Sequence, residues 1–438
     1  MFKRLCIGIL ALLFATIGAK GQTLVPAAIK TTDSIIMDFM DQRFGLFIHW
    51  GPVTLRGTEI GWSRNHQVAQ NDYDSLYKEF DPVLFNAEEW VKIAKAAGIK
   101  YLTITAKHHD GFCLWPSAFT DYTIRHSPYK KDIVGQLQKA CKKYGIKFCI
   151  YYTILDWHHP DYPSHNDGKK PQDSSKGDMK RFVLYMKNQL KELITSYHPY
   201  MLWFDGNWEA PWTQEMAVDL YGYIKKLDPA VIINNRLGKT DHKLLTAETV
   251  GDYATPEQEI GRFNMTDPWE SCITICKQWA WKPNDQMKSF TECIRTLSKT
   301  AGGNGNLLLN IGPMPDGRIE KRQAERLKEV GNWLRVNGAA IYGTRAGPFK
   351  PDSIFSSTRK GNKIFFHVYS NNNGSLNIPA MPGRKIVKAY FLARGNISFS
   401  ENNNRIVLSW TGEIPDPACS IIVLEMNASV DAIPLVNQ

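Results

Sequence analysis

A unit of one amphipathic helix and one short apolar strand recurs along this chain, and it restricts the possible folds more than any other feature. In the first copy, NAEEWVKIAKAAGIKYLTIT, Asn86 is a suitable N-cap residue, Gly98 ends the helix, and residues 101–105 form the strand. The pattern returns in DIVGQLQKACKKYGIKFCIYYT, FVLYMKNQLKELITSYHPYMLWFD and MAVDLYGYIKKLDPAVIINNR. Apolar strands that alternate with helices are typical of a parallel sheet with both faces covered.

The number of these units favours a closed barrel over an open sheet. Strands are expected at residues 44–49, 101–105, 148–152, 201–205 and 231–235, with weaker candidates at residues 244–246, 273–276 and 306–311. Eight β/α units in one domain predict a (β/α)8 barrel of the TIM type rather than an open, doubly wound sheet. No GxGxxG motif follows a strand, which argues against a dinucleotide cofactor.

The pattern changes after Gly343. Runs such as KIFFHVYS, KIVKAYFLA and SIIVLEM are strand-like, and NNNG, MPGR and ENNN between them have the composition of turns. We therefore predict an α/β chain with a (β/α)8-like barrel at residues 22–345, the candidate catalytic domain, and a small antiparallel β-sandwich at residues 346–438. The sandwich is expected to support the barrel by packing against it, and a carbohydrate-binding module is the alternative.

The N-terminus has the composition of a secretory signal peptide, expected at residues 1–21. Lys3 and Arg4 precede an apolar run at residues 5–17, which is too short to span a bilayer comfortably, and small residues for cleavage follow. A buried N-terminal helix is the alternative interpretation. The mature protein is expected to be exported, to the periplasm or outside the cell, and no later segment is apolar enough for membrane insertion.

Charge and cysteine content argue against several classes of function. The formal net charge of +10 falls to +7 without Lys3, Arg4 and Lys20, and the remaining lysines are scattered, so no nucleic-acid partner is expected. Cys272 and Cys276 are too far apart for a CxxC pair, and no second pair follows. We predict no structural metal and no cofactor.

Polar and aromatic side chains gather where the expected strands end, which in such a barrel is the catalytic face. They are histidines, tyrosines, an arginine, carboxylates and tryptophans: His49, Trp50, His108, His109, Tyr151, Tyr152, Asp205, Arg236, Glu248, Asp252, Glu257, Glu259, Glu270 and Trp279. A single residue of this kind is usually structural. So many at one face predict a catalytic site.

This set of side chains suits glycoside hydrolysis, which needs two carboxylates. One carboxylate attacks the anomeric carbon, and the other protonates the leaving oxygen and then deprotonates water. Asp205, at the end of the apolar strand, is well placed as the nucleophile, since Tyr152 and the histidines could keep it ionised. Tryptophans would pack on the apolar face of the sugar ring.

Metal-dependent hydrolysis is the first alternative function. HHD at residues 108–110 and DWHHPDYPSH at residues 156–165, together with His49, could supply zinc ligands. Adjacent residues of a regular strand point to opposite faces, so His108 and His109 are not expected to reach one ion. The second alternative is a carbohydrate-binding protein on a degenerate barrel. It would lack a nucleophile or an acid, and candidates for both are present.

Seven stretches resemble the retaining α-L-fucosidases, a family of exo-acting glycoside hydrolases. They are FGLFIHWG, GTEIGWSRN, AKHHDGFCLW, LWFDG, TPE, WESCITI and LLLNIGPMPDG, in the family's order, within residues 44–317. The resemblance implies release of terminal α-linked L-fucose from a fucosylated oligosaccharide or glycoconjugate, with retained configuration, through a covalent fucosyl-enzyme. Another exo-specificity, for galactosides, is a further alternative, which an apolar wall against the C6 methyl group would disfavour.

The resemblance also implies roles for individual residues. The aspartate of WFDG is the family's nucleophile and corresponds to Asp205. Binding positions correspond to His49, Glu59, Trp62, His108, His109, Tyr152, Trp203, Arg236 and Trp279. The acid/base position varies among relatives: Glu257 of TPEQ is favoured, Glu270 of PWESC is the main alternative, and Glu259 is a third. The chain departs from the family in GTEIGW, where two residues separate the glutamate from the tryptophan.

Overall fold

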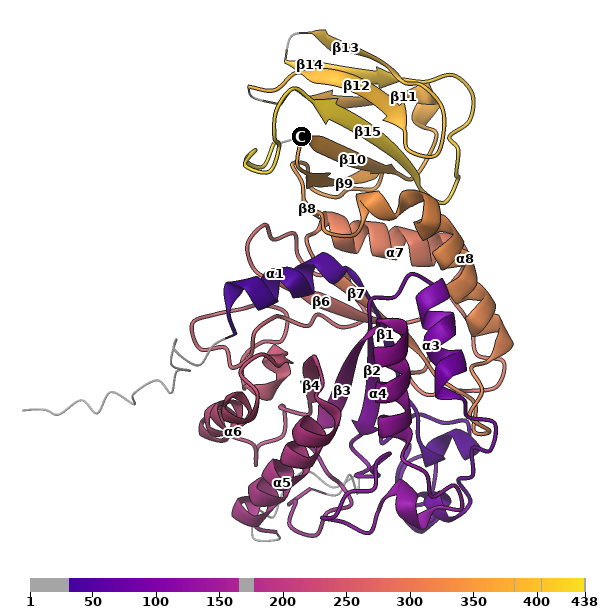
Figure 1. Ribbon diagram of the computed structural model, residues 1–438, viewed down its shortest axis with the longest axis vertical. Coiled ribbons are helices and arrows are strands. Elements are labelled where there is room, and N and C mark those ends of the chain that lie inside the picture. The colour runs from indigo at the N-terminus through magenta and orange to yellow at the C-terminus, as the bar shows by residue number, and fades with distance from the viewer. Residues whose placement is uncertain (1–30, 165–176, 382, 403, 437–438) are drawn as a thin grey trace, which may run out of the picture.

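Helices and strands alternate along the computed structural model, which describes residues 31–164, 177–381, 383–402 and 404–436. Seven parallel strands form one sheet: β1 (Phe44–Ile48), β2 (Tyr101–Lys107), β3 (Lys147–Thr153), β4 (Met201–Asp205), β5 (Ile232–Ile233), β6 (Glu270–Thr274) and β7 (Asn306–Ile311). Their order in the sheet is β5-β4-β3-β2-β1-β7-β6, and helices cover its outer face (Figure 1). Strands β1, β2 and β7 are buried along their whole length, as expected for a sheet covered on both faces.

Local sequence signals set the ends of the helices between the strands. These helices are α1 (Asp33–Gln42), α2 (Gln70–Tyr73), α3 (Ala87–Ala96), α4 (Ile133–Tyr144), α5 (Met179–Tyr197), α6 (Gln214–Leu227), α7 (Phe290–Gly302) and α8 (Lys321–Asn337). Asn86 caps α3 by accepting the backbone N–H of Glu89, and Asp132 caps α4 in the same way. Gly145 ends α4 in the left-handed conformation at φ 71°. The predicted helix–strand units are thus confirmed.

The eighth position of the barrel contains no regular strand among the described residues. The strand predicted at residues 244–246 is wrong, because this segment is irregular. Isolated parallel bridges instead join Tyr253, Ala254 and Glu257 to the segments on either side. Pro256 lies within this stretch and has no N–H to donate to a ladder. The fold is therefore mixed α/β around a seven-stranded parallel sheet, without the eight regular strands that we expected.

Strand β6 begins earlier than the sequence predicted. We expected a strand at residues 273–276, whereas β6 spans Glu270–Thr274. Glu270 starts this strand and pairs with Asn306 at the start of β7. Asp205, by contrast, is the last residue of β4. Since all these strands are parallel, Glu270 and Asp205 belong to opposite ends of the sheet.

The residues after α8 form two antiparallel sheets. One has the order β12-β15-β10-β9-β8, and the other has the order β11-β14-β13. The strands are β8 (Arg345–Ala346), β9 (Phe355–Lys360), β10 (Lys363–Val368), β11 (Ser375–Pro379), β12 (Ile386–Phe391), β13 (Ser398–Asn402), β14 (Arg405–Ser409) and β15 (Ser420–Met426). Both sheets contribute to one apolar cluster, which includes Phe366 and Leu408. The domain boundary predicted between residues 345 and 346 falls inside β8.

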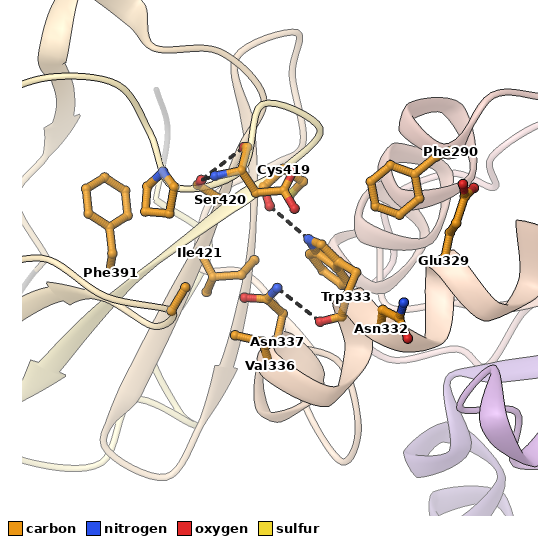
Figure 2. A pocket seen from close by; sticks show the side chains of 13 residues that line it. Phe290, Glu329, Asn332, Trp333, Val336, Asn337, Phe391, Cys419, Ser420 and Ile421 are labelled. Carbon is orange, nitrogen blue, oxygen red and sulfur yellow. Dashed lines mark hydrogen bonds between the residues drawn. The ribbon is translucent and has the colours of Figure 1, made fainter.

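The five-stranded antiparallel sheet packs on α7 and α8, and the three-stranded sheet lies on its far side (Figure 1). Trp333 of α8 donates from Nε1 to the carbonyl of Cys419 at 3.0 Å, and Ser356 of β9 donates to the carbonyl of Ser298 in α7 at 3.1 Å. A cavity of about 490 Å³ lies in this interface, and Figure 2 shows Trp333 pointing from its helix toward the strand that follows Cys419. These contacts fit a supporting role for the C-terminal sheets.

Two of the predictions concern export and membranes. The predicted signal peptide at residues 1–21 lies outside the described residues. Within the part of the chain that the structure describes, no helix is both long enough and apolar enough to cross a bilayer. The seven cysteines from Cys113 to Cys419 are all buried thiols, and Cys272 and Cys276 are not joined by a disulfide.

Candidate active site

A cavity of about 300 Å³ opens at the C-terminal ends of the parallel strands. Eight of the predicted site residues line it, namely His49, Trp62, His108, Trp203, Asp205, Arg236, Glu257 and Trp279, together with Phe47, Tyr151, Trp208 and Cys272. The cavity therefore gathers residues from strands that lie far apart in the sequence. The larger cavity between α8 and the antiparallel sheets has no histidine among its described lining residues.

Asp205 ends β4 with its carboxylate directed at three polar groups. Arg236 donates from Nη1 to Oδ1 at 3.0 Å, and the hydroxyl of Tyr151 donates to Oδ2 at 3.3 Å. His109 lies with Nε2 3.6 Å from the same Oδ2. The Asp205 side chain is only 14% exposed, so these partners stabilise a charge that is largely removed from water.

Arg236 is fixed by its own neighbours and touches both candidate catalytic carboxylates. Its Nε donates to the hydroxyl of Thr255 at 3.0 Å, and its Nη2 donates to the Thr255 carbonyl at 3.0 Å. Nη2 also lies 2.8 Å from Oε2 of Glu257. The neighbouring carboxylates of Asp205 and Glu257 outweigh the burial and hold the pKa of Arg236 above its ordinary value. The guanidinium thus stays charged between the two acids.

Glu257 lies on the irregular segment that replaces the eighth strand. Its bridge to Cys272 places it beside β6, on the same cavity as Asp205. The Glu257 side chain is 36% exposed, more than twice the exposure of Asp205. The site therefore holds one enclosed carboxylate and one that water can reach.

Three histidines contribute imidazoles to the site. His49 follows β1 and shares a 2.6 Å hydrogen bond between Nδ1 and Oδ1 of Asn310, and His109 shares a 2.7 Å bond with the hydroxyl of Thr153. Burial lowers the pKa of His49 and of His109 to about 3, and it lowers the pKa of His108 well below the ordinary value. All three are neutral near pH 7, so each ring has one N–H donor and one acceptor nitrogen. In His49 the Asn310 oxygen accepts the Nδ1–H, which leaves Nε2 as an acceptor for a hydroxyl group.

The adjacent histidines do not follow the strand geometry that we expected. Strand β2 ends at Lys107, so His108 and His109 lie beyond its regular alternation, and their ring centroids are 4.2 Å apart. Both rings therefore face the same site. Even so, no group of three His, Cys, Asp or Glu side chains in the described ranges is arranged to hold a metal ion.

Aromatic rings form the walls of the cavity. Trp203 stacks on Tyr151 with ring centroids 5.6 Å apart and an interplanar angle of 17°, and the Arg236 guanidinium lies 4.9 Å from the Trp203 ring. Phe47 and Trp279 meet edge to face at 6.1 Å. Such walls suit the C–H face of a sugar and lower the local dielectric around the carboxylates.

The tyrosine at this site is Tyr151, and the structure contradicts the assignment of Tyr152. The Tyr152 hydroxyl points away, where it accepts from Nζ of Lys107 at 3.0 Å and donates to Gln189 at 2.8 Å. Neighbouring residues of β3 face opposite sides of the sheet. Tyr151 faces the cavity, and Tyr152 faces the buried layer beneath α5.

Glu59 does not line the cavity either. Its carboxylate accepts the backbone N–H of Trp279 at 2.9 Å and of Ala280 at 3.0 Å. Burial raises its pKa, although these hydrogen bonds oppose the shift. Glu59 therefore fixes the loop that carries Trp279, while Trp62, three residues later, lies at the cavity rim.

The glutamates left open by the sequence are clearly separated by the structure. Glu270 is fully buried and accepts hydrogen bonds from Nε1 of Trp203 at 3.0 Å and from Tyr101. Burial raises the pKa of Glu270 to about 7. Glu259 is on the surface, 2.7 Å from Nζ of Lys243. Of the three, only Glu257 lines the cavity, so Glu270 is not placed to reach a leaving group.

Three lining residues were not named as site residues from the sequence: Phe47, Trp208 and Cys272. Tyr151 was named at its strand end, but the resemblance gave the binding role to Tyr152. Trp208 carried a signal in the sequence, because it lies three residues after Asp205 in a tryptophan-rich stretch. Phe47 and Cys272 carried none, because they belong to apolar strands in which the inward-facing positions cannot be recognised without the fold.

Comparisons of sequence agree with this geometry. The sequence model of the alpha-L-fucosidase family matches residues 22–339. The chain is 31% identical over 342 residues to the plasma alpha-L-fucosidase of Rattus norvegicus, covering 72% of each chain. It is 29% identical over 412 residues to the tissue alpha-L-fucosidase of Macaca fascicularis, covering 87% of this chain and 85% of the relative.

Comparisons of structure lead to the same family. Alpha-L-fucosidase isoenzyme 1 from Paenibacillus thiaminolyticus superposes with a TM-score of 0.80 at 32% identity, over 90% of this chain and 99% of that one. An alpha-L-fucosidase from Bacteroides thetaiotaomicron, solved as a trapped covalent intermediate with 2-fluoro-fucosyl fluoride, superposes with a TM-score of 0.82 at 29% identity, over 91% and 97%. This chain, with its paired carboxylates in a cavity at the strand ends, belongs to the α-L-fucosidase family of glycoside hydrolases.

Proposed function

We propose that this protein removes terminal α-linked L-fucose from glycans with retention of configuration, through a covalent fucosyl-enzyme. The observation that carries the proposal is Arg236, whose guanidinium lies 3.0 Å from Asp205 and 2.8 Å from Glu257. Two carboxylates bound to one guanidinium are held near each other, and retaining enzymes need a separation of about 5–5.5 Å. The covalent intermediate trapped in the Bacteroides thetaiotaomicron relative supports the same chemistry.

The reaction takes two steps, and both carboxylates return to their starting forms in the second one. First, a carboxylate oxygen of Asp205 forms a bond to C1 of fucose, while the bond from C1 to the leaving oxygen breaks and Glu257 gives its proton to that oxygen. Then a water oxygen forms a bond to C1, its proton passes to Glu257, and the C1 ester to Asp205 breaks. The greater exposure of Glu257 suits this role, because both the leaving group and water must reach it.

The cavity supports recognition of one terminal sugar. Its volume of about 300 Å³ is at the lower end of the range for ligand sites, which fits a single pyranose ring and exo action. The neutral imidazoles of His49, His108 and His109 can bind ring hydroxyls. Phe47 and Trp279 offer an apolar wall that suits the C6 methyl group of fucose and disfavours the C6 hydroxyl of galactose.

We also propose export, on the strength of the basic and apolar N-terminal residues. The natural substrate would then be a fucosylated oligosaccharide or glycoconjugate that the enzyme meets in the periplasm or outside the cell. N-terminal sequencing of the protein recovered from those fractions should give a start close to residue 22. Recovery of a chain that still begins at Met1 would contradict this proposal.

The mechanism is tested with an aryl α-L-fucoside. Asp205→Asn should abolish turnover while circular dichroism shows an intact fold, and Glu257→Gln should lose roughly 10²–10⁴-fold in turnover. Glu259→Gln is the matched control, because this surface residue lies two positions away and pairs with Lys243. It should behave as the parent enzyme. NMR of the first product should show the α anomer.

A second variant separates acid/base chemistry from simple damage. In Glu257→Ala, added azide should restore turnover and yield fucosyl azide, because a small anion replaces the water that Glu257 would activate. Azide should not accelerate the Glu259→Gln control. Near-normal turnover by Asp205→Asn, or azide rescue of Glu270→Ala but not of Glu257→Ala, would refute the assigned roles.

A further inference from the structure

Two tryptophans form an exposed aromatic surface at the mouth of the cavity. Trp62 is 44% exposed and Trp208 is 47% exposed, whereas the other ten lining residues are buried or half-buried. The two rings stack with centroids 5.9 Å apart and an interplanar angle of 19°. They come from different loops, one after β1 and one after β4. An exposed apolar patch of this kind at the rim of a cavity is a candidate ligand surface.

The pair is held in place from beneath and from the side. His109 meets Trp62 edge to face at 5.6 Å and meets Trp208 in the same way at 5.5 Å. Trp157 packs against Trp62 at 5.2 Å and donates from Nε1 to Glu209 at 3.1 Å. A surface that is already ordered costs little conformational entropy when a ligand binds to it.

The loop of Trp208 has an additional anchor. Nζ of Lys239 donates to the carbonyl of Asn207 at 2.6 Å and to the carbonyl of Glu209 at 3.0 Å, on either side of the tryptophan. The indole N–H groups of Trp62 and Trp208 themselves donate to nothing in the described part of the chain. Each indole therefore offers an apolar face and one free donor, which is the combination that binds a sugar ring.

The orientation of the bound substrate decides which part of it would contact the rings of Trp62 and Trp208. If one fucosyl unit fills the cavity, with C1 at Asp205 and the leaving oxygen at Glu257, everything attached to that oxygen must leave through the mouth. The cavity has no room for a second ring at about 300 Å³. The leaving group therefore lies at the rim, where Trp62 and Trp208 are the only exposed side chains among the described lining residues.

We infer that Trp208, which is held against Trp62, binds the first sugar ring of the leaving group, a hexopyranose with an apolar C–H face such as a galactosyl residue. This inference rests on the proposed function and names the substrate class for the same site. It makes Trp208 a residue that determines specificity for the leaving group rather than for fucose.

The test compares two substrates that share the fucosyl unit and differ in the leaving group. α-L-Fucosyl fluoride leaves a single atom, and a disaccharide of L-fucose α-linked to galactose leaves a ring. Trp208→Ala should lower kcat/KM for the disaccharide roughly tenfold more than for the fluoride, and Trp208→Phe should restore most of the difference. Phe399→Ala is the matched control, because Phe399 is 39% exposed on β13, far along the chain in the antiparallel sheets.

The possible outcomes distinguish the leaving-group role of Trp208 from the proposed function itself. Equal losses on both substrates would show that Trp208 acts on the fucosyl unit or on the fold, and they would overturn the inference. No loss on either substrate would overturn it as well, while turnover of the fluoride would still support the proposed function. A parent enzyme that released fucose from neither compound would refute the proposed function itself.

Discussion

Arg236 donates from Nη1 to Oδ1 of Asp205 at 3.0 Å, between side chains that are only 5% and 14% exposed. The guanidinium cannot turn away, because Thr255 binds two of its other N–H groups. A strand that ends in a half-buried carboxylate is therefore stable here, since the charge meets a fixed opposite charge. The same contact, together with the Tyr151 hydroxyl, fixes the direction of the carboxylate at the cavity.

Replacing Arg236 by lysine tests whether the shape of the guanidinium matters as well as its charge. A lysine ammonium cannot contact Asp205, Glu257 and Thr255 together, because it is a single nitrogen on a flexible stem. We expect Arg236→Lys to lower kcat/KM on an aryl α-L-fucoside roughly 10²-fold or more. The control is Arg262→Lys, at an exposed position. If Arg236→Lys lost less than about threefold, the bridging role of Arg236 would be wrong.

The neighbouring tyrosines of β3 give a matched pair of variants. Tyr151→Phe removes the hydroxyl that donates to Asp205, so kcat/KM should fall roughly tenfold with little change in the melting temperature. Tyr152→Phe removes a partner of the buried Lys107 and should lower the free energy of unfolding by about 1–3 kcal/mol, with activity retained. Kinetics and thermal melts of both variants check this, and the reverse pattern would restore Tyr152 to the site.

The difference between these two residues shows what the sequence could predict. Helix caps such as Asn86 and glycine stops such as Gly145 act locally, so the order of helices and strands was visible in the sequence. The direction of Tyr151 and Tyr152 was not visible, because β3 is buried on both faces and apolar at almost every position. A strand with one solvent-exposed face would have shown alternating polar and apolar residues in the sequence.

The two glutamates show a second limit. Glu257 lies on an irregular segment without strand periodicity, and Glu270 starts a strand that the sequence placed three residues too late. Glu257 was favoured from the resemblance alone, and the misplaced strand hid which end of the sheet Glu270 occupies. That is decided by tertiary pairing, as in the contact of Glu270 with Asn306, and not by local propensity.

His108 should make the protein sensitive to acid. Its pKa is well below the ordinary value in the folded state, whereas an unfolded histidine titrates near about 6.5, so the unfolded chain binds the extra proton. Stability should therefore be lost as the pH falls below about 6.5, by up to about 1.4 kcal/mol per pH unit for this group. The pKa values of His49 and His109 are also lowered in the folded state, so these two histidines add to the loss of stability at low pH.

The variant His108→Phe isolates this contribution. Phenylalanine keeps the ring stacked on Tyr151, and the Nδ1 that it removes has no hydrogen-bond partner among the described residues. Urea denaturation at pH 7, 6 and 5 should show His108→Phe gaining stability relative to the parent as the pH falls, with little activity remaining. The exposed His126→Phe serves as control. A difference that stays constant with pH would contradict the prediction.

Glu270 should change the pH dependence of stability in the opposite direction to His108. Burial raises its pKa from 4.5 to about 7, so the folded state holds the proton more tightly than the unfolded chain does. Its contribution to stability is complete below pH 4.5 and is lost as the pH rises through about 7. Glutamine does not titrate and keeps an oxygen for the N–H of Trp203, while the hydroxyl of Tyr101 can turn to accept from the new amide.

Thermal melts of the variant Glu270→Gln test this. Its melting temperature relative to that of the parent should rise between pH 5 and pH 8, with Glu259→Gln as a control that shows no such trend. Turnover of the aryl fucoside should fall far less than in Glu257→Gln, and a loss as large as that of Glu257→Gln would return the acid/base role to Glu270.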